Sequence, residues 1–145
     1  MYDIAIVGAG IVGLGHALAA RRRGLSVIVI DREERAIGAS IRNFGFITVT
    51  GQRRGDTWRR ARRSAEIWRD LAQHTPIQIV QRGLLLAVRR PEGTPIVDAF
   101  LRTEMGDGCA MLSAEEARAR IAGLDGANLT AALWSPHDLR VESRE

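Results

Sequence analysis

The sequence predicts an α/β fold that begins with a βαβ unit and continues into a segment of mixed helices and strands. Apolar, β-branched runs over residues 4–7 and 26–31 are typical of buried parallel strands. Between them, apolar residues recur at helical spacing, arginines fill the last turn, and Gly24 provides a common helix stop. A strand, a glycine turn, a helix and a second strand in this order indicate one unit with a right-handed crossover.

The next segment, residues 32–55, shows no sustained period, apart from one possible helical turn in "EERAIG" and a short strand in "FITVT". Irregular runs of this length in a compact domain are usually functional or disordered. The apolar and aromatic residues in this run favour a functional loop.

A helix is predicted from an N-cap at Asp56 to about His74, because apolar residues recur there at spacings of three and four. This apolar stripe consists of Trp58, Ala61, Ala65, Trp68 and Ala72. The tryptophans lie on the same stripe as the alanines and not among the arginines, so a buried face is favoured over a nucleic-acid interface.

The remaining elements alternate between strands and helices. "IQIV" and "LLLAV" are predicted as two strands joined by a tight turn at "QRG". Thr94 and Pro95 begin a helix, and Ser113 with Glu116 forms a capping box at the start of another. "LTAALW" is predicted as a strand and "SPHD" as the turn after it.

The composition is that of a globular protein, with 46% hydrophobic and 26% charged residues. All 21 basic residues are arginines and they are mostly scattered, so the net charge of +4 does not predict a nucleic-acid partner. The single Cys109 excludes an internal disulfide and a multi-cysteine metal site, and it fits a reducing compartment. No run reaches membrane-spanning length, so we expect a cytoplasmic protein without a bound metal.

The segment "GAGIVG" predicts a dinucleotide site between the first strand and the helix. Gly8 permits a tight turn, Gly10 lets the backbone approach a pyrophosphate, and Gly13 lets the helix lie close to the strand. Asp31 ends the second strand, where a carboxylate accepts hydrogen bonds from ribose hydroxyls and disfavours NADP. NAD and FAD both remain possible on these residues. The residues expected to contact the cofactor in the turn are Gly8, Ala9, Gly10, Ile11, Val12 and Gly13.

The loop "GASIRNFG" favours FAD, because an extended flavin cofactor needs a loop along its ribityl chain and ring. Ser40 offers a hydroxyl and Arg42 a positive charge near phosphate or reduced flavin. The alternative is a polar surface loop in which Asn43 and Gly45 only form a turn.

Together, "DIAIVGAGIVGLGHALAARRRGLSVIVIDR" and "GASIRNFGF" resemble the N-terminal end of the D-amino-acid oxidase-like (DAO) superfamily of FAD-dependent oxidoreductases. The form "SIRNFG…TGQ" resembles a bacterial subgroup associated with phosphonate catabolism. The resemblance continues more weakly through "RGLLLAV" and "LWSPHDLRVESRE". It implies oxidation of the C–N bond of a small amine, amino acid or aminophosphonate by hydride transfer to FAD.

The resemblance also implies a division into domains and a role for each site residue. Residues 1–75 would form the N-terminal, Rossmann-like part of an FAD-binding domain, residues 76–140 part of an α+β substrate domain, and residues 141–145 the start of a return to the FAD domain. Gly8, Gly10 and Gly13 would face the pyrophosphate, Asp31 the ribose and Arg32 the adenine side. The residues expected along the ribityl chain and ring are Ser40, Arg42, Asn43 and Gly45.

Members of this superfamily are more than twice as long, so we expect the chain to be truncated. Two alternatives stay open: a catalytically silent fragment, or an NAD-binding Rossmann module. No catalytic residue is predicted, because the segments that shape the substrate face of the family lie beyond this sequence.

Overall fold

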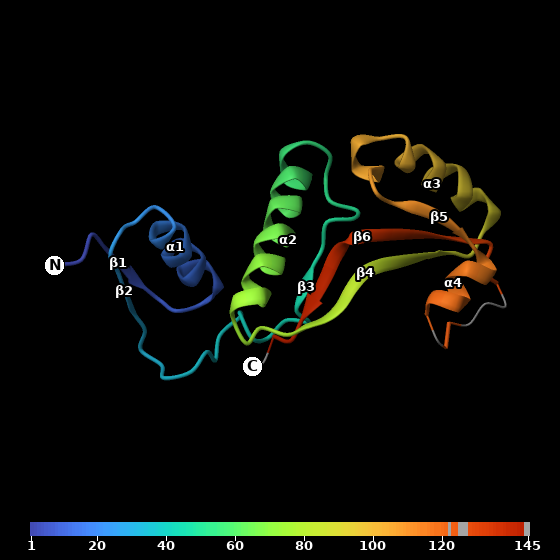
Figure 1. Ribbon diagram of the computed structural model, residues 1–145. Helices are drawn as coiled ribbons and strands as arrows, with labels where there is room; N and C mark the ends of the chain where they lie inside the picture. The colour runs from blue at the N-terminus through green and yellow to red at the C-terminus, as the bar shows by residue number, and fades with distance from the viewer. Residues whose placement is uncertain (122, 125–127, 144–145) are drawn as a thin grey trace. The chain divides into compact units, whose positions relative to one another are not determined.

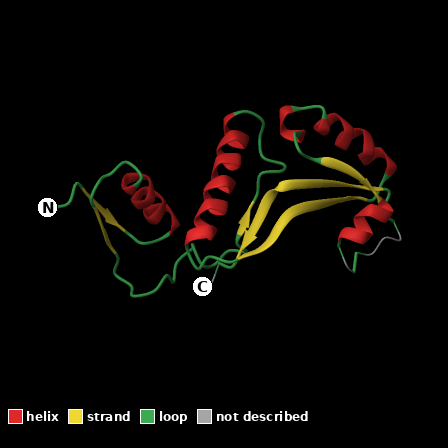
Figure 2. Ribbon diagram, in the orientation of Figure 1, coloured by secondary structure: helices red, strands yellow, loops and turns green. Residues whose placement is uncertain are grey.

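The computed structural model describes residues 1–121, 123–124 and 128–143 (Figure 1). The chain forms two compact units: unit 1 contains residues 1–45 and Ser143, and unit 2 contains residues 46–142. Unit 1 holds β1 (Ile4–Val7), α1 (Ile11–Arg21) and β2 (Val27–Ile30). The elements of unit 2 are β3 (Phe46–Ile47), α2 (Asp56–His74), β4 (Ile79–Val88), α3 (Thr94–Leu101), β5 (Ala110–Ser113), α4 (Ala114–Arg120) and β6 (Ala131–Val141), with two short 3-10 helices at Pro91–Gly93 and Glu104–Gly106 (Figure 2).

Unit 1 is the predicted βαβ unit. β1 and β2 pair in parallel, with Ile4 opposite Val27 and Val7 opposite Ile30, and α1 connects them. Gly24 has a φ of +79° and its N–H donates to the carbonyl of Arg21 at 3.0 Å, so the predicted helix stop is confirmed. The α/β fold class is therefore confirmed. "EERAIG", in contrast, forms bends and not the predicted turn of helix.

Unit 2 is built on an antiparallel sheet in the order β3-β6-β4, with β5 also paired to β6. The apolar stripe of α2 contributes to one core cluster, where Ala65 packs with Val49 and Leu139. Trp58, Ala61 and Trp68 surround this cluster, which confirms the predicted buried face of α2.

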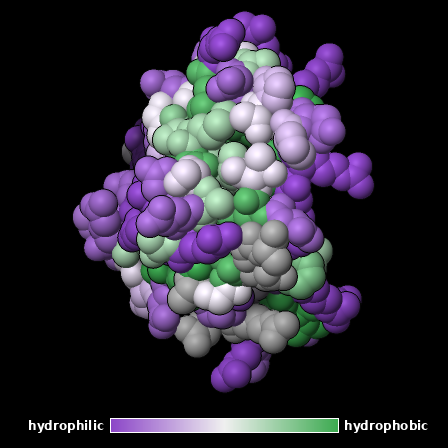
Figure 3. Space-filling model, turned by 90° about the vertical axis from the view of Figure 1, so that its right-hand side faces the viewer, coloured by the Kyte–Doolittle hydropathy of each residue, from purple (hydrophilic) through white to green (hydrophobic). Residues whose placement is uncertain are grey.

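The other end of the sheet is covered by the shorter helices. Val97 of α3 packs against Val88 and Leu133, and Ala117 of α4 packs against Ala132. Figure 3 views the molecule from this end: hydrophilic side chains stand out around the margins, with hydrophobic ones between them. The face is therefore mixed and not a continuous apolar surface. Within the part of the chain that the structure describes, no helix is both long and apolar enough to cross a membrane.

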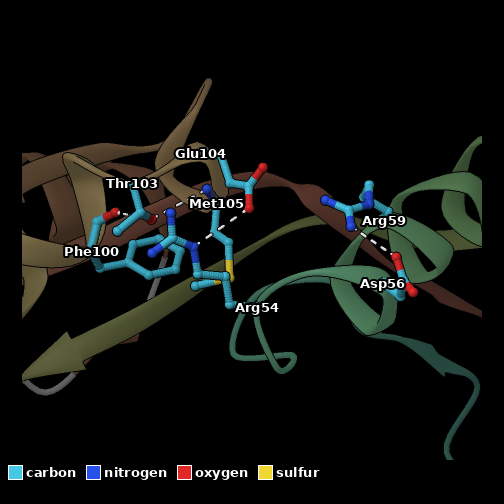
Figure 4. A network of polar contacts seen from close by, with 7 residues as sticks. All are labelled: Arg54, Asp56, Arg59, Phe100, Thr103, Glu104 and Met105. Carbon is cyan, nitrogen blue, oxygen red and sulfur yellow. Dashed lines mark hydrogen bonds and ion pairs between the residues drawn. The ribbon is translucent and has the colours of Figure 1, made fainter.

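Gly55, and not Asp56, is the N-cap of α2, so the predicted cap is wrong. Gly55 has a φ of +91°, which glycine adopts without strain, while Asp56 is the first helical residue and pairs with Arg59 at 2.8 Å (Figure 4). Just before the helix, Arg54 forms an ion pair with Glu104 at 3.5 Å. The cap of the helix is thus a backbone feature, and the carboxylate instead supports the first turn.

Two further corrections concern β4 and β6. The predicted hairpin at "QRG" is wrong, because β4 is one strand that passes through Gly83, whose φ is +82°. The predicted turn at "SPHD" is wrong as well, because these residues lie inside β6. The two errors have one cause: the pairing jumps from Arg82–Leu139 to Leu84–Ser135, so three residues of β6 oppose Gly83 in a bulge. Pro136 is tolerated there because the ladder is interrupted.

The capping box of α4 is confirmed in full. The side chain of Ser113 accepts from the N–H of Glu116 at 3.2 Å, and the side chain of Glu116 accepts from the N–H of Ser113 at 2.7 Å. β5, which ends at this cap, was missed by the sequence analysis. Its four residues pair with Ala131–Trp134 of β6 and carry no alternation strong enough to mark a strand.

Candidate cofactor site

The glycine turn after β1 is shaped by contacts that only glycines permit. Gly8 has a φ of +105°, and its N–H donates to the carbonyl of Ile30 at 2.7 Å, which ties the turn to the end of β2. A side chain at Gly13 would collide with the carbonyl oxygen of Gly8 and lie 3.3 Å from Ile6. The helix α1 therefore lies directly against the turn, as the sequence predicts.

The N-terminus of α1 receives its cap from the loop and not from the helix itself. Gly10 precedes the helix without a side chain, and Ser40 Oγ accepts the N–H of Ile11 at 2.9 Å. A Cβ at Gly10 would lie 3.2 Å from this oxygen, so the absence of a side chain makes room for the hydroxyl. The N–H groups of Val12 and Gly13 belong to the first turn, which has no partners within the helix. Such groups, with the helix dipole, favour an anion.

Asp31 closes the site from the end of β2. Its carboxylate accepts the N–H of Ala9 at 2.5 Å and the N–H of Glu33 at 2.9 Å. These backbone hydrogen bonds, that of Ala9 first, hold the pKa of Asp31 below its ordinary value. The group is therefore ionised at neutral pH and keeps lone pairs for further donors such as ribose hydroxyls.

A groove with a volume of about 290 Å³ lies between the glycine turn, the end of β2 and the start of the following loop. Five of the predicted site residues line this groove: Ala9, Gly10, Asp31, Arg32 and Ser40. The lining consists of Ala9, Gly10, Asp31, Arg32, Glu33, Glu34, Arg35, Ala36, Ile37, Gly38 and Ser40. The exposed side chain of Arg32 pairs with Glu33 at 2.8 Å. Sequence reasoning missed residues 33–38, although their position directly after Asp31 could have indicated them.

The second half of the loop is held by its own side chains. Asn43 Nδ2 donates to the carbonyl of Ser40 at 2.6 Å, and Asn43 Oδ1 accepts the N–H of Gly45 at 2.7 Å. Ser143 Oγ donates to the carbonyl of Asn43 at 2.8 Å. Arg42 is exposed, and it lies outside the lining of the groove together with Asn43 and Gly45. The structure thus brings Ser40 to the turn, while Asn43 and Gly45 shape the loop.

The residues of unit 1 fit the adenosine diphosphate part of a dinucleotide. A Cβ at Gly8 would meet nothing within 4 Å, so a ligand has space to approach the turn. First-turn N–H groups supply donors for a pyrophosphate, and Asp31 supplies acceptors for a ribose. Arg32 contributes a positive side chain at the rim of the same groove.

Comparisons with known proteins identify the family to which the chain is similar. A family model described as "FAD dependent oxidoreductase" (DAO) matches residues 3–145. Among solved structures, the chain is similar to glycine oxidase from Bacillus cereus ATCC 14579, with a TM-score of 0.76 and 22% identity over 100% of this chain and 42% of that one. It is also similar to L-proline dehydrogenase from P. horikoshii, with a TM-score of 0.81 and 24% identity over 98% of this chain and 38% of that one.

A third similar structure is glycine oxidase from Geobacillus kaustophilus, with a TM-score of 0.73 and 25% identity over 99% of this chain and 41% of that one. The chain therefore spans about two fifths of the length of these structures. A search of the curated proteins finds no match.

Proposed function

The chain belongs to the family of FAD-dependent oxidoreductases, and we propose that it forms the FAD-binding portion of an enzyme that oxidises the C–N bond of a small amine or amino acid. The family assignment confirms the predicted DAO-like identity and selects FAD over NAD. The observation that carries the proposal is the groove in which the glycine turn, Asp31 and Ser40 meet.

Each of these residues has a role toward the cofactor in this proposal. The first-turn N–H groups of Val12 and Gly13 bind the pyrophosphate, and Asp31, ionised and held by Ala9, accepts the ribose hydroxyls. Ser40 keeps its own O–H as a donor while its oxygen caps α1. FAD, when bound, supplies the acceptor for the hydride that leaves the substrate carbon.

The loop residues beyond Ser40 are assigned to the flavin end of the cofactor. We place Arg42, Asn43 and Gly45 along the ribityl chain and ring. The exposed guanidinium of Arg42 supports this placement, because a positive charge stabilises reduced flavin. Asn43 acts indirectly, by fixing the turn around Gly45.

The proposed substrate class is an amine or amino acid, with aminophosphonates as its narrower form. Similar structures include proteins described as glycine oxidase, L-proline dehydrogenase and L-amino acid deaminase. The segment "SIRNFG…TGQ" supports the aminophosphonate subgroup. The test is to measure oxidation of glycine, proline and aminomethylphosphonate, with oxygen and with an artificial electron acceptor, and to compare the rates for these three substrates.

We also propose the domain division at residues 75 and 140, with the last residues returning to the FAD domain. The grouping of Ser143 with unit 1 supports this return.

The location in the cytoplasm belongs to the same proposal, and fractionation of cells that express the tagged protein tests it.

The decisive experiment is to purify the full-length polypeptide that carries residues 1–145, denature it and identify the released flavin by chromatography. We expect FAD at near one equivalent, and a much smaller amount from the Asp31→Ala variant. A protein that releases no flavin and takes up none on reconstitution would refute the proposal. The same assay on the isolated 145-residue chain tests the alternative of a silent fragment, which predicts little or no bound FAD.

A further inference from the structure

β6 carries a buried carboxylate that the proposed function does not use. Asp138 is 3% exposed and accepts four hydrogen bonds within unit 2. Its Oδ1 accepts the N–H groups of Val49 and Thr50 at 2.8 and 3.0 Å. Its Oδ2 accepts the hydroxyls of Thr50 and Ser135 at 2.5 and 2.9 Å. All four donors converge on one side chain, so the carboxylate is fully engaged.

The four bonds explain why a carboxylate is tolerated at this position. A buried charge is costly unless it is hydrogen-bonded, and a carboxylate satisfies several donors at once. Val49 is completely buried, and its N–H lies outside any strand of the sheet. Asp138 therefore serves two consecutive backbone donors that the sheet does not pair.

These donors lie just after the loop that carries the predicted flavin contacts. Only Phe46, Ile47 and Thr48 separate Gly45 from Val49. Phe46 and Ile47 form β3, which pairs with Arg140 and Leu139 of β6, the residues directly after Asp138. The carboxyl-terminal half of β6 thus fixes the chain at two successive points where it leaves the loop.

We propose that Asp138 is a positioning residue for the loop 38–45 and acts through residues 46–50. This inference rests on the proposed function, in which the loop lies along the ribityl chain and ring of FAD. With the carboxylate present, the exit of the loop is ordered before the cofactor binds. Without it, FAD has to order this segment on binding, and the affinity falls by the cost of that ordering.

The test measures FAD affinity of the full-length apoprotein by flavin fluorescence, well below the melting temperature of every variant. Asp138→Ala removes all four acceptor contacts, and we expect FAD binding about tenfold weaker. Asp138→Asn is the conservative variant: its amide oxygen accepts both N–H groups, and its NH2 donates to the two hydroxyls. We expect it to restore affinity to within about threefold.

Leu133→Ala is the matched control, because Leu133 is a buried residue of the same strand in a different core cluster. It lowers stability without touching the exit of the loop. A structural role alone predicts equal losses of FAD affinity in Leu133→Ala and Asp138→Ala at equal loss of melting temperature. The positioning role predicts that only Asp138→Ala changes the affinity and the absorption spectrum of flavin bound at saturation.

If Asp138→Ala does not fold, Thr50→Val removes one hydroxyl donor at nearly constant shape, with exposed Thr57→Val as its control. Weaker FAD binding in Thr50→Val alone supports the inference. Equal affinity in both, or equal losses in Asp138→Ala and Asp138→Asn, would overturn it. If the wild-type protein binds no FAD, the proposed function itself fails, which is a distinct result.

Discussion

The close approach of α1 to the glycine turn can be tested with two alanine substitutions on the same helix. Gly13 and Gly15 are both helical residues, but their surroundings differ. A Cβ at Gly13 would overlap the carbonyl oxygen of Gly8, whereas one at Gly15 meets nothing within 4 Å. Gly13→Ala and Gly15→Ala therefore share the gain in helix propensity and differ only in the collision.

The expected magnitudes follow from these two contributions. Alanine is favoured over glycine inside a helix by about 1 kcal/mol, so Gly15→Ala should stabilise unit 1 by roughly that amount. At Gly13 the same gain is opposed by overpacking of about 1–3 kcal/mol. The obstacle is a backbone oxygen, which cannot rotate away, so the upper end of this range applies. The two variants should thus differ by about 2–3 kcal/mol, with Gly13→Ala below the wild type.

The assay is hydrogen exchange of the α1 and β1 amides by mass spectrometry, together with FAD binding. We expect faster exchange and weaker FAD binding in Gly13→Ala, because moving the helix displaces the first-turn N–H groups. Gly15→Ala should exchange more slowly and bind FAD like the wild type. Equal protection in the two variants would refute the argument that glycine is needed at position 13 for close packing.

Three further predictions rest on side-chain chemistry. The pKa of Asp31 is lower in the folded state than in the unfolded state, so its contribution to the stability of unit 1 is present above about pH 4, the unfolded pKa. This contribution is lost as the pH falls through the lower folded value. Between pH 7 and pH 3, Asp31→Asn should therefore lose less hydrogen-exchange protection in α1 than the wild type does. Ser113→Ala should destabilise unit 2 by about 1 kcal/mol through loss of the cap, while Ser64→Ala in α2 should not, as measured by urea denaturation. Burial raises the pKa of Cys109 and so lowers its thiolate fraction at pH 8; a thiol reagent should therefore modify it more slowly than it modifies free cysteine.

The features that sequence reasoning predicted correctly are set by residues close together in the chain. The βαβ unit follows from short apolar runs and a glycine turn, and the cap of α4 follows from Ser113 and Glu116. Asp31 was also placed correctly at the end of β2, beside the glycine turn. In each case the deciding contact lies within one turn or one supersecondary unit, where spacing alone constrains the geometry.

The two errors in β4 and β6 depend on partners distant in the sequence. Ser135, Pro136 and Asp138 form a turn-like combination, and nothing local shows that the strand continues through them. What keeps them in β6 is the bulge opposite Gly83 and the bonds from Asp138 to Val49 and Thr50, 88 or 89 residues away. A polar cluster whose hydrogen-bond donors lie nearby in the chain usually forms a turn. Here the N–H groups that Asp138 accepts come from a distant segment, and the cluster lies within a strand. The sequence shows the polar cluster at residues 135–138, but it does not identify the distant backbone N–H groups that Asp138 accepts.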